Sequence, residues 1–334
     1  IDIKDNPKLI VTKSTVPVGT GKDLESYILN YRKELKVVKN FDIASNPEFL
    51  REGSAIEDFM RPDRVVCGVS SEFAKSILKT LYRPLNLRET PILFTKRETA
   101  ELIKYASNGF LATKITFINE MADICEKVGA DVQDVAKGIG LDGRIGSKFL
   151  HPGPGFGGSC FPKDTRALAE IGKESGARTN LIETVIKVND SRKINMVKKI
   201  TEAVGSLENK TIAVLGITFK PNTDDMRESP SLVIVPGLLK RAKKVKVYDP
   251  VGMNNAKQMA EFDGVIWTEN TFSCIENTDA IVIITEWNEF RALDLIKIKK
   301  FLNKPIIIDL RNIYKHDSMR EAGIKYISVG RGDT

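Results

Sequence analysis

A cysteine inside a glycine-rich stretch is the residue of this chain best placed to do chemistry. Cys160 follows the run Gly153–Gly158, and Lys163 and Asp164 follow Cys160 by three and four residues. Glycine permits backbone conformations closed to other residues and lets a ligand approach main-chain N–H groups. A helical pattern begins just after the cysteine, and a helix N-terminus and a nearby ammonium both favour the thiolate over the thiol. The stretch therefore predicts a nucleophilic cysteine with Asp164 as a proton acceptor. The alternative is a glycine-rich turn around a buried, inert cysteine.

The remaining cysteines and histidines offer little material for other kinds of site. The four cysteines lie far apart and form no Cys-x-x-Cys pair. We therefore expect neither a disulfide framework nor structural zinc. Only two histidines are present, His151 and His316, so neither a Ser-His-Asp triad nor a histidine-rich metal site is expected.

Length and composition are those of a globular protein with two or three domains. The chain has 334 residues, of which 42% are hydrophobic and 28% charged. It has no apolar run of membrane-spanning length and no signal-peptide pattern, so we expect a cytoplasmic protein. The formal charge is +7, but lysines and arginines are spread along helices, which argues against a nucleic-acid partner. A mild positive charge suits an anionic small molecule, although a lysine-rich solvated surface explains it equally well.

The first part of the chain alternates strand and helix patterns. Apolar runs at 9–15, 41–45, 64–69 and 91–95 predict strands, and a helical pattern covers 22–35. Such alternation predicts a parallel sheet built from βαβ units. No glycine-rich strand-to-helix turn opens this part.

The middle of the chain is predicted to be helical. Apolar residues recur at helical spacing from 96 to 128 and predict one long helix. Shorter helices are expected at 132–139 and 165–171, and another at 181–204. A plain structural bundle with a dimer interface would explain this section without a catalytic role.

A second alternation of strands and helices begins at Thr211. Strands are predicted at 211–216, 245–249, 264–267, 279–285, 305–310 and 325–329, with a helix at 231–241, which indicates a second doubly wound domain. The turn after its first strand, Gly216–Pro221, lacks the Gly-x-Gly-x-x-Gly pattern but could bind a nucleotide. Ligands of open α/β sheets bind at the carboxyl ends of the strands, and this rule singles out Lys220, Arg227 and Arg311 as a phosphate clamp. The alternative for each cation is a solvated surface residue.

Several segments taken together resemble the UDP-glucose/GDP-mannose dehydrogenase family, and most closely its UDP-glucose-oxidising members. The matching segments occur in the family's order across essentially the whole chain. They are Ser14–Thr20, Asn46–Gly53, Ala100–Asn108, Arg144–Asp164, Gly216–Lys220 with Arg227–Ser229, and Asp309–Asn312.

The resemblance implies two Rossmann-like doubly wound parallel sheets joined by a central helical dimerisation region with a long helix. The expected domains are the C-terminal part of an NAD-binding Rossmann domain at 1–95, a central helical domain with the cysteine loop at 96–205, and a UDP-sugar-binding domain at 206–334. The first sheet is expected to be incomplete, because the family's glycine-rich NAD turn has no counterpart in this sequence. We accordingly expect this stretch to bind NAD poorly, and it could be inactive.

The resemblance also implies a reaction. Family members oxidise a sugar C6 alcohol to a carboxylate in two steps with two NAD⁺, here UDP-glucose to UDP-glucuronate. Cys160 would add to the intermediate aldehyde as a thiohemiacetal, whose oxidation gives a thioester that water hydrolyses. The covalent adduct restores the tetrahedral alcohol centre that a second hydride loss requires, and a thiolate is well suited to form it at neutral pH.

Roles for further residues follow from the resemblance alone. Asp164 is expected to activate water, with Thr15 and Glu52 holding that water, and Lys104 and Asn108 to stabilise the oxyanion from one helix face. An ordinary polar helix stripe would also explain that pair. The remaining expected contacts fall into two groups. Those to the UDP-sugar are Glu48, Arg144, Phe149, His151, Gly157, Lys220 and Arg311, and those to NAD are Thr15, Glu52, Lys163 and Arg227. Arg144 would come from a neighbouring subunit, which implies a homodimer or a higher homo-oligomer. No metal is expected.

One residue departs from the pattern, and three other functions stay open. His151 stands where animal members carry a lysine, and neutral histidine supplies less charge to a diphosphate. The alternatives are a dehydrogenase of another nucleotide sugar (GDP-mannose or a UDP-N-acetylhexosamine), a truncated non-catalytic nucleotide-sugar-binding fragment, and a cysteine hydrolase. The hydrolase is disfavoured because the motif has no histidine next to Cys160.

Overall fold

The computed structural model describes residues 7–34, 41–88 and 90–332 of the chain. The chain divides into two compact units, one of residues 1–109 and 167–179 and the other of residues 110–166 and 180–334. Two helices contribute residues to both units, α4 (Arg97–Val128) and α6 (Phe161–Glu174). None of the helices in the described ranges is long and apolar enough to cross a membrane.

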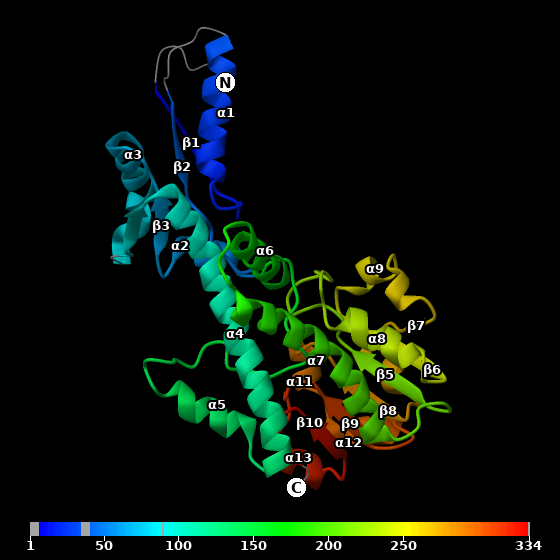
Figure 1. The fold of residues 1–334 in the computed structure, drawn as a ribbon. Helices are drawn as coiled ribbons and strands as arrows, with labels where there is room; N and C mark the ends of the chain where they lie inside the picture. Colours follow the sequence, from blue (N-terminus) through cyan, green and yellow to red (C-terminus); the bar gives the residue numbers. More distant parts are fainter. Residues whose placement is uncertain (1–6, 35–40, 89, 333–334) are drawn as a thin grey trace. The chain divides into compact units, whose positions relative to one another are not determined.

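The first unit contains a four-stranded sheet with the order β1-β2-β3-β4 (Figure 1). Its strands are β1 (Lys8–Thr12), β2 (Phe41–Ser45), β3 (Val65–Gly68) and β4 (Ile92–Thr95). Its other elements are α1 (Thr20–Glu34), α2 (Ala55–Met60), α3 (Glu72–Tyr82) and the 3₁₀ helix η1 (Arg83–Arg88). The strands predicted from the sequence are all present, and the predicted helix at 22–35 is α1 as far as residue 34, with residue 35 outside the described residues.

One pairing in this sheet differs from the expected parallel arrangement. Strands β1 and β2 pair in parallel, as do β3 and β4, but β2 and β3 run antiparallel. The two inner strands meet only at Ser45 and Gly68. The sheet therefore consists of two parallel pairs joined at one end, a pairing that strand patterns alone do not specify.

The second unit contains a six-stranded sheet in which every pair is parallel. The strand order is β10-β9-β8-β5-β6-β7, which is the doubly wound order 3-2-1-4-5-6 when β5 is counted as the first strand. The strands are β5 (Thr211–Leu215), β6 (Lys244–Tyr248), β7 (Ile266–Trp267), β8 (Ala280–Ile283), β9 (Ile306–Asp309) and β10 (Lys325–Ser328). The predicted doubly wound domain is confirmed.

Helices cover both faces of this sheet. On one face lie α7 (Asn180–Val204) and α8 (Ser231–Leu239), and on the other lie α10 (Thr271–Ile275) and α12 (Leu295–Phe301). The second unit also contains α5 (Val132–Gly140), α9 (Met253–Ala256), η2 (Ala260–Phe262), α11 (Asn288–Arg291) and α13 (His316–Glu321), together with the second part of α4.

The central strands β5, β8 and β9 are almost entirely apolar because both of their faces are buried. Successive side chains point to opposite faces of a strand. Ile212 and Val214 of β5 accordingly join the core beneath α7 and α8, whereas Ala213 and Leu215 join the core beneath α10 and α12. The sheet thus has one hydrophobic core on each face, and these cores fix the positions of the loops at the carboxyl ends of its strands.

The chain order reverses at β5, which pairs with β6 on one side and with β8 on the other. In doubly wound sheets, ligands bind outside the carboxyl ends of the strands at such a reversal. The loops after β5, β8 and β9 are therefore the place to look for a ligand site.

Candidate active site

Cys160 lies directly before the first residue of α6, so the predicted helix N-terminus is present, although the helix begins at Phe161 and not at the predicted Thr165. The amide of Asp164 donates to the Cys160 carbonyl over 2.8 Å and closes the first turn of the helix. Pro162 fits this first turn because its missing N–H would have no partner there. The Cys160 thiol lies 3.6 Å from the Ser159 hydroxyl and is partly exposed. Its position at a helix N-terminus, open to solvent, is that of a reactive thiol.

The other three cysteines are buried. Burial raises the pKa of the Cys67 thiol to about 11 and that of the Cys274 thiol to about 12. Such thiols are not thiolates at neutral pH and are inert to large reagents. Burial, which the alternative interpretation requires, is therefore found for these three cysteines and not for Cys160, whose reactivity stays a prediction.

The glycines before Cys160 allow two loops of the second unit to pack together. A side chain on Gly157 would place its Cβ atom 2.3 Å from the carbonyl oxygen of Glu228. Gly158 has a φ of +85°, and its amide donates to the Arg227 carbonyl over 2.8 Å. A Cβ atom on Gly158 would lie 2.7 Å from the Phe219 ring. These contacts require glycine and join the cysteine loop to the segments after β5.

Arg311 ties the loops at the chain reversal of the second sheet together. Its Nε donates to the Ile284 carbonyl over 2.7 Å, and its Nη2 donates to the Phe219 carbonyl over 3.2 Å. Nε also lies 3.1 Å from a carboxylate oxygen of Glu286. A Cβ atom on Gly153 would lie 3.2 Å from Nη1 of the same guanidinium. The cysteine loop thus lies beside the edge of the sheet where a nucleotide is expected.

Lys220 lies at the same edge and is half-buried. Its ammonium is 5.1 Å from the centre of the Phe219 ring. Arg227 is mainly exposed and forms a bidentate pair with the buried carboxylate of Asp225, with its Nε and Nη2 donating over 2.9 and 2.8 Å. Of the three predicted cations, the structure brings Lys220 and Arg311 to the loop after β5, whereas the Arg227 guanidinium bonds Asp225.

Two buried carboxylates that the sequence analysis did not single out hold these loops. Asp249, directly after β6, accepts from the amide of Ile217 over 2.8 Å and from the indole of Trp287 over 3.1 Å. Asp309, the last residue of β9, accepts from the amide of Arg311 over 2.9 Å and from the hydroxyl of Tyr326 over 2.6 Å.

Burial raises the pKa of the Asp309 carboxyl group. The available signal was an aspartate at the carboxyl end of β6 and of β9, since a charged residue that is buried there needs a partner.

Asp164 and Lys163 lie in the first turn of α6. The Asp164 carboxylate is fully buried, and the Lys163 ammonium, on an exposed side chain, lies 3.2 Å from its Oδ1. The predicted proton acceptor therefore lies about one helical turn after Cys160. Lys163, expected to contact NAD, bonds this carboxylate.

The loop from 141 to 151 carries three predicted substrate ligands. The Arg144 side chain is 90% exposed and pairs with Asp142 at 2.6 Å. This pairing raises the pKa of Arg144 and lowers that of Asp142. His151 is exposed, and Phe149 has a φ of 65° with its ring centre 6.0 Å from that of Phe161. The loop thus holds Phe149 against α6 and directs Arg144 to solvent.

In the first unit, Lys104 and Asn108 are both buried one turn apart on α4. The Lys104 ammonium lies 3.5 Å from the Glu48 carboxylate and 5.3 Å from the centre of the Phe49 ring. Arg64 stacks on the same ring at 3.7 Å. The structure therefore brings Lys104 and Glu48 together, as parts of one polar cluster around Phe49.

Thr15 is half-buried in the segment after β1, and Glu52 is exposed in the segment before α2. Thr15 lies at the carboxyl end of its strand, the edge where α/β sheets bind nucleotide cofactors, so this edge fits NAD. The first turn of α1 does not fit a pyrophosphate, because the buried Glu101 carboxylate accepts from the amides of Gly19 over 2.7 Å and Gly21 over 3.0 Å. The described ranges contain no group of three or more potential metal ligands.

Comparison with protein families gives three matches along the chain. The NAD binding domain of the UDP-glucose/GDP-mannose dehydrogenase family matches residues 2–86, its central domain matches 98–191, and its UDP binding domain matches 213–316.

The chain is similar to several named dehydrogenases and to a solved structure. The chain is 54% identical over 328 residues to a UDP-glucose 6-dehydrogenase of Rhizobium meliloti, a match that covers 97% of this chain and 74% of that protein. It is 48% identical to the UDP-glucose 6-dehydrogenase TuaD of Bacillus subtilis, covering 97% of this chain and 69% of that protein. The structure of a UDP-glucose dehydrogenase from Pyrobaculum islandicum superposes with a TM-score of 0.86 at 39% identity, covering 99% of this chain and 73% of that chain.

Proposed function

Because this chain belongs to the UDP-glucose/GDP-mannose dehydrogenase family, we propose that it oxidises UDP-glucose to UDP-glucuronate through Cys160. NAD is the cofactor and supplies the hydride acceptor when bound. The observation that carries the proposal is the partly exposed thiol at the start of α6, on a loop that lies beside Arg311 at the edge of the second sheet. A thiol there can meet a sugar whose nucleotide is bound at that edge.

Cys160 performs the covalent steps. Its sulfur adds to the C6 aldehyde formed in the first oxidation, and the aldehyde oxygen takes up a proton to give a thiohemiacetal. Loss of a hydride and a proton from this adduct gives the thioester. Water then attacks the thioester carbonyl, which releases the carboxylate and returns the thiol. A thiolate is a strong nucleophile for the first step and an adequate leaving group for the last.

Five further residues assist the reaction at C6 of the sugar. Asp164 takes a proton from water, and Thr15 and Glu52 hold that water. Lys104 and Asn108 donate to the oxygen on which negative charge develops, where a fixed donor is effective because it needs no reorganisation. The burial of Lys104 and Asn108 on one face of α4 supports this role.

The nucleotide part of the substrate binds at the chain reversal of the second sheet. Lys220 and Arg311 contact the diphosphate or the sugar, and the main chain at Gly157 is a further proposed contact. Glu48, Phe149 and His151 add contacts to the substrate, and Arg144 is supplied by a neighbouring subunit. Thr15, Glu52, Lys163 and Arg227 are the proposed contacts to NAD.

A homodimer is supported by a stripe of exposed apolar side chains on α4. Phe110, Phe117 and Ile124 recur every seven residues, with exposed fractions of 66%, 45% and 51%, and Val128 continues the stripe. A heptad spacing keeps such side chains on one helix face, where a second copy can bury them. Phe117→Lys should convert a dimer to a monomer in light scattering, and an unchanged mass would exclude this interface.

The domain division at 1–95, 96–205 and 206–334 is also a proposal, as is a cytoplasmic location. Limited proteolysis tests the division, because exposed boundaries near residues 95 and 205 would be cut first. Cell fractionation of the tagged chain tests the location.

The function is tested by following NADH formation with UDP-glucose, GDP-mannose and UDP-N-acetylmannosamine. We expect the highest rate of NADH formation with UDP-glucose, and two NADH formed for each UDP-glucuronate. Turnover with another sugar only would establish a different substrate. Binding of UDP-glucose with no NADH from any sugar would favour the non-catalytic fragment and overturn the proposal. A parallel titration with NAD⁺ tests the expectation that this stretch binds the cofactor weakly.

A further inference from the structure

Three buried polar side chains of α4 and α7 hydrogen-bond the main chain of the cysteine loop. We propose that Asn119, Asn189 and Arg192 are positioning residues that fix the backbone from Gly153 to Phe156 and, through it, Cys160. The inference rests on the proposed function for the role of Cys160, and on the hydrogen bonds themselves for the clamp. We call these three side chains the loop clamp.

The Asn189 side chain hydrogen-bonds the main chain of the loop, as a neighbouring strand would. Its Oδ1 accepts from the Phe156 amide over 2.8 Å, and its Nδ2 donates to the Phe156 carbonyl over 3.1 Å. The side chain is 4% exposed, so both bonds are shielded from water. Gly155, with a φ of +114°, leaves room for this approach, since a Cβ atom there would lie 3.0 Å from Oδ1. A single amide therefore satisfies both main-chain groups of Phe156.

Asn119 and Arg192 hold Gly153 in the same way. Oδ1 of Asn119 accepts from the Gly153 amide over 2.8 Å, and Nε of Arg192 donates to the Gly153 carbonyl over 2.6 Å. Nη1 of Arg192 also donates to the main-chain carbonyl of Asn119 over 3.1 Å. The two side chains are 2% and 5% exposed. They therefore connect α4, α7 and the loop in one network.

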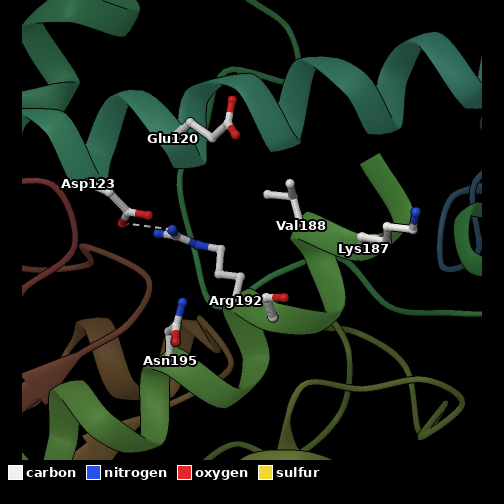
Figure 2. A pocket seen from close by; sticks show the side chains of 7 residues that line it. Glu120, Asp123, Lys187, Val188, Arg192 and Asn195 are labelled. Atoms are coloured by element: carbon white, nitrogen blue, oxygen red, sulfur yellow. Dashed lines mark hydrogen bonds and ion pairs between the residues drawn. The ribbon is translucent and has the colours of Figure 1, made fainter. Parts of the chain in front are cut away.

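Figure 2 shows the outer side of this network, where Arg192 reaches from α7 to Asp123 on α4. Nη1 donates to the Asp123 carboxylate over 2.9 Å, and that carboxylate is 60% exposed. A pocket of about 180 Å³ lies here, lined also by Glu120, Lys187, Val188, Ser191 and Asn195. Asp123 touches the guanidinium but not the loop, so it provides a control for the loss of charge pairing alone.

The clamp is needed because the loop cannot order itself. Four of the six residues from Gly153 to Gly158 are glycines, and each glycine loses more conformational entropy on folding than any other residue. Pro154 has no N–H with which to bond a neighbour. The loop pairs with no strand of either sheet. Fixed partners on two packed helices therefore hold the first part of the loop, from Gly153 to Phe156, while Gly157 and Gly158 pack on the segment after β5, and Cys160 follows within a few residues.

The decisive variant is Asn189→Leu, which keeps the number of heavy atoms and the branching of the side chain but removes both bonds to Phe156. We expect the Phe156 amide to exchange its hydrogen about tenfold faster or more in residue-resolved hydrogen exchange, with the Gly153 amide less affected. With UDP-glucose, kcat should fall about 10- to 100-fold while KM stays within about threefold, because a displaced nucleophile slows chemistry more than binding. A merely structural role would lower the amount of folded enzyme, and the kcat of each folded molecule would not change.

Two further variants keep the test decisive if Asn189→Leu fails to fold. Asn189→Asp keeps the acceptor for the Phe156 amide but loses the donor to the Phe156 carbonyl, so the Phe156 amide should exchange more slowly and kcat should fall less than in Asn189→Leu, while the buried charge lowers Tm. Asp123→Asn should leave both amides and kcat within about twofold of wild type. Unchanged exchange of the Phe156 amide in Asn189→Leu, or faster exchange with unchanged kcat, would overturn the proposal. Absence of turnover in the wild type would instead refute the proposed function, and the exchange measurements would still decide the clamp.

Discussion

Gly157 is the position in the cysteine loop where a single methyl group has the largest predicted effect. An alanine Cβ atom there would lie 2.3 Å from the Glu228 carbonyl oxygen, 2.9 Å from the Glu228 carbonyl carbon and 3.2 Å from Cα of Ser229. The backbone at Gly157 does not have a positive φ, so the obstacle is contact and not conformation. Carbon and oxygen atoms of this kind approach to about 3.3 Å, so the two segments must separate by about 1 Å.

That displacement predicts separate effects on stability and on catalysis. Overpacking of a filled site costs about 1–3 kcal/mol of unfolding free energy. A shift of about 1 Å in a positioned nucleophile can cost about 100-fold in rate. Because Gly157 lies three residues before Cys160, we expect Gly157→Ala to lower kcat by about 100-fold and to leave a folded enzyme with a lower Tm.

The assay compares steady-state NADH formation and thermal unfolding of Gly157→Ala with those of Gly138→Ala. Gly138 lies within α5, and a Cβ atom there would meet nothing within 4 Å. Alanine at such a helix position should stabilise the protein by about 0.5–1 kcal/mol and leave kcat unchanged. A Gly157→Ala enzyme with a kcat within about twofold of wild type would refute the inferred close packing of the cysteine loop on Glu228.

Three other variants test separate parts of the site. Cys160→Ala should abolish UDP-glucuronate formation and leave the Kd for UDP-glucose, measured by calorimetry, within a few-fold, whereas loss of binding would mean that Cys160 is structural. Lys104→Met should lower kcat about 10²- to 10³-fold, the usual loss on removing an oxyanion donor, and a loss below about threefold would refute that role.

Hydrogen bonding by Arg166 lowers the pKa of Glu228, so the stability contributed by this carboxylate is fully present above its unfolded pKa and is lost as the pH falls through the lowered folded value. Glu228→Gln should therefore lower Tm at neutral pH, and the difference from wild type should disappear in acid. A Tm difference that does not change with pH would exclude the ion pair as its cause.

Local patterns were sufficient to predict the elements of the fold. The apolar repeat from 96 to 128 predicts α4 almost to its ends, because that repeat reflects one buried face along a single helix. The central strands β5, β8 and β9 were recognisable as nearly continuous apolar runs because both of their faces are buried, whereas β6 alternates lysine with buried valine. The start of α6 was placed four residues too late. Phe161 and Pro162 do not form a helical repeat, although proline is well tolerated in a first turn.

The sequence by itself determined the chemistry that is available in this chain, namely one cysteine after a run of glycines, with lysine and aspartate one helical turn beyond it. Those features are local, and residue types within a dozen positions decide them. Only the tertiary structure decided what surrounds them. It placed Asn189 on Phe156, 33 residues away, and it used the amides at the start of α1 for Glu101, 80 or more residues away. Such partners are chosen by packing between distant segments, and no spacing along the chain encodes that choice.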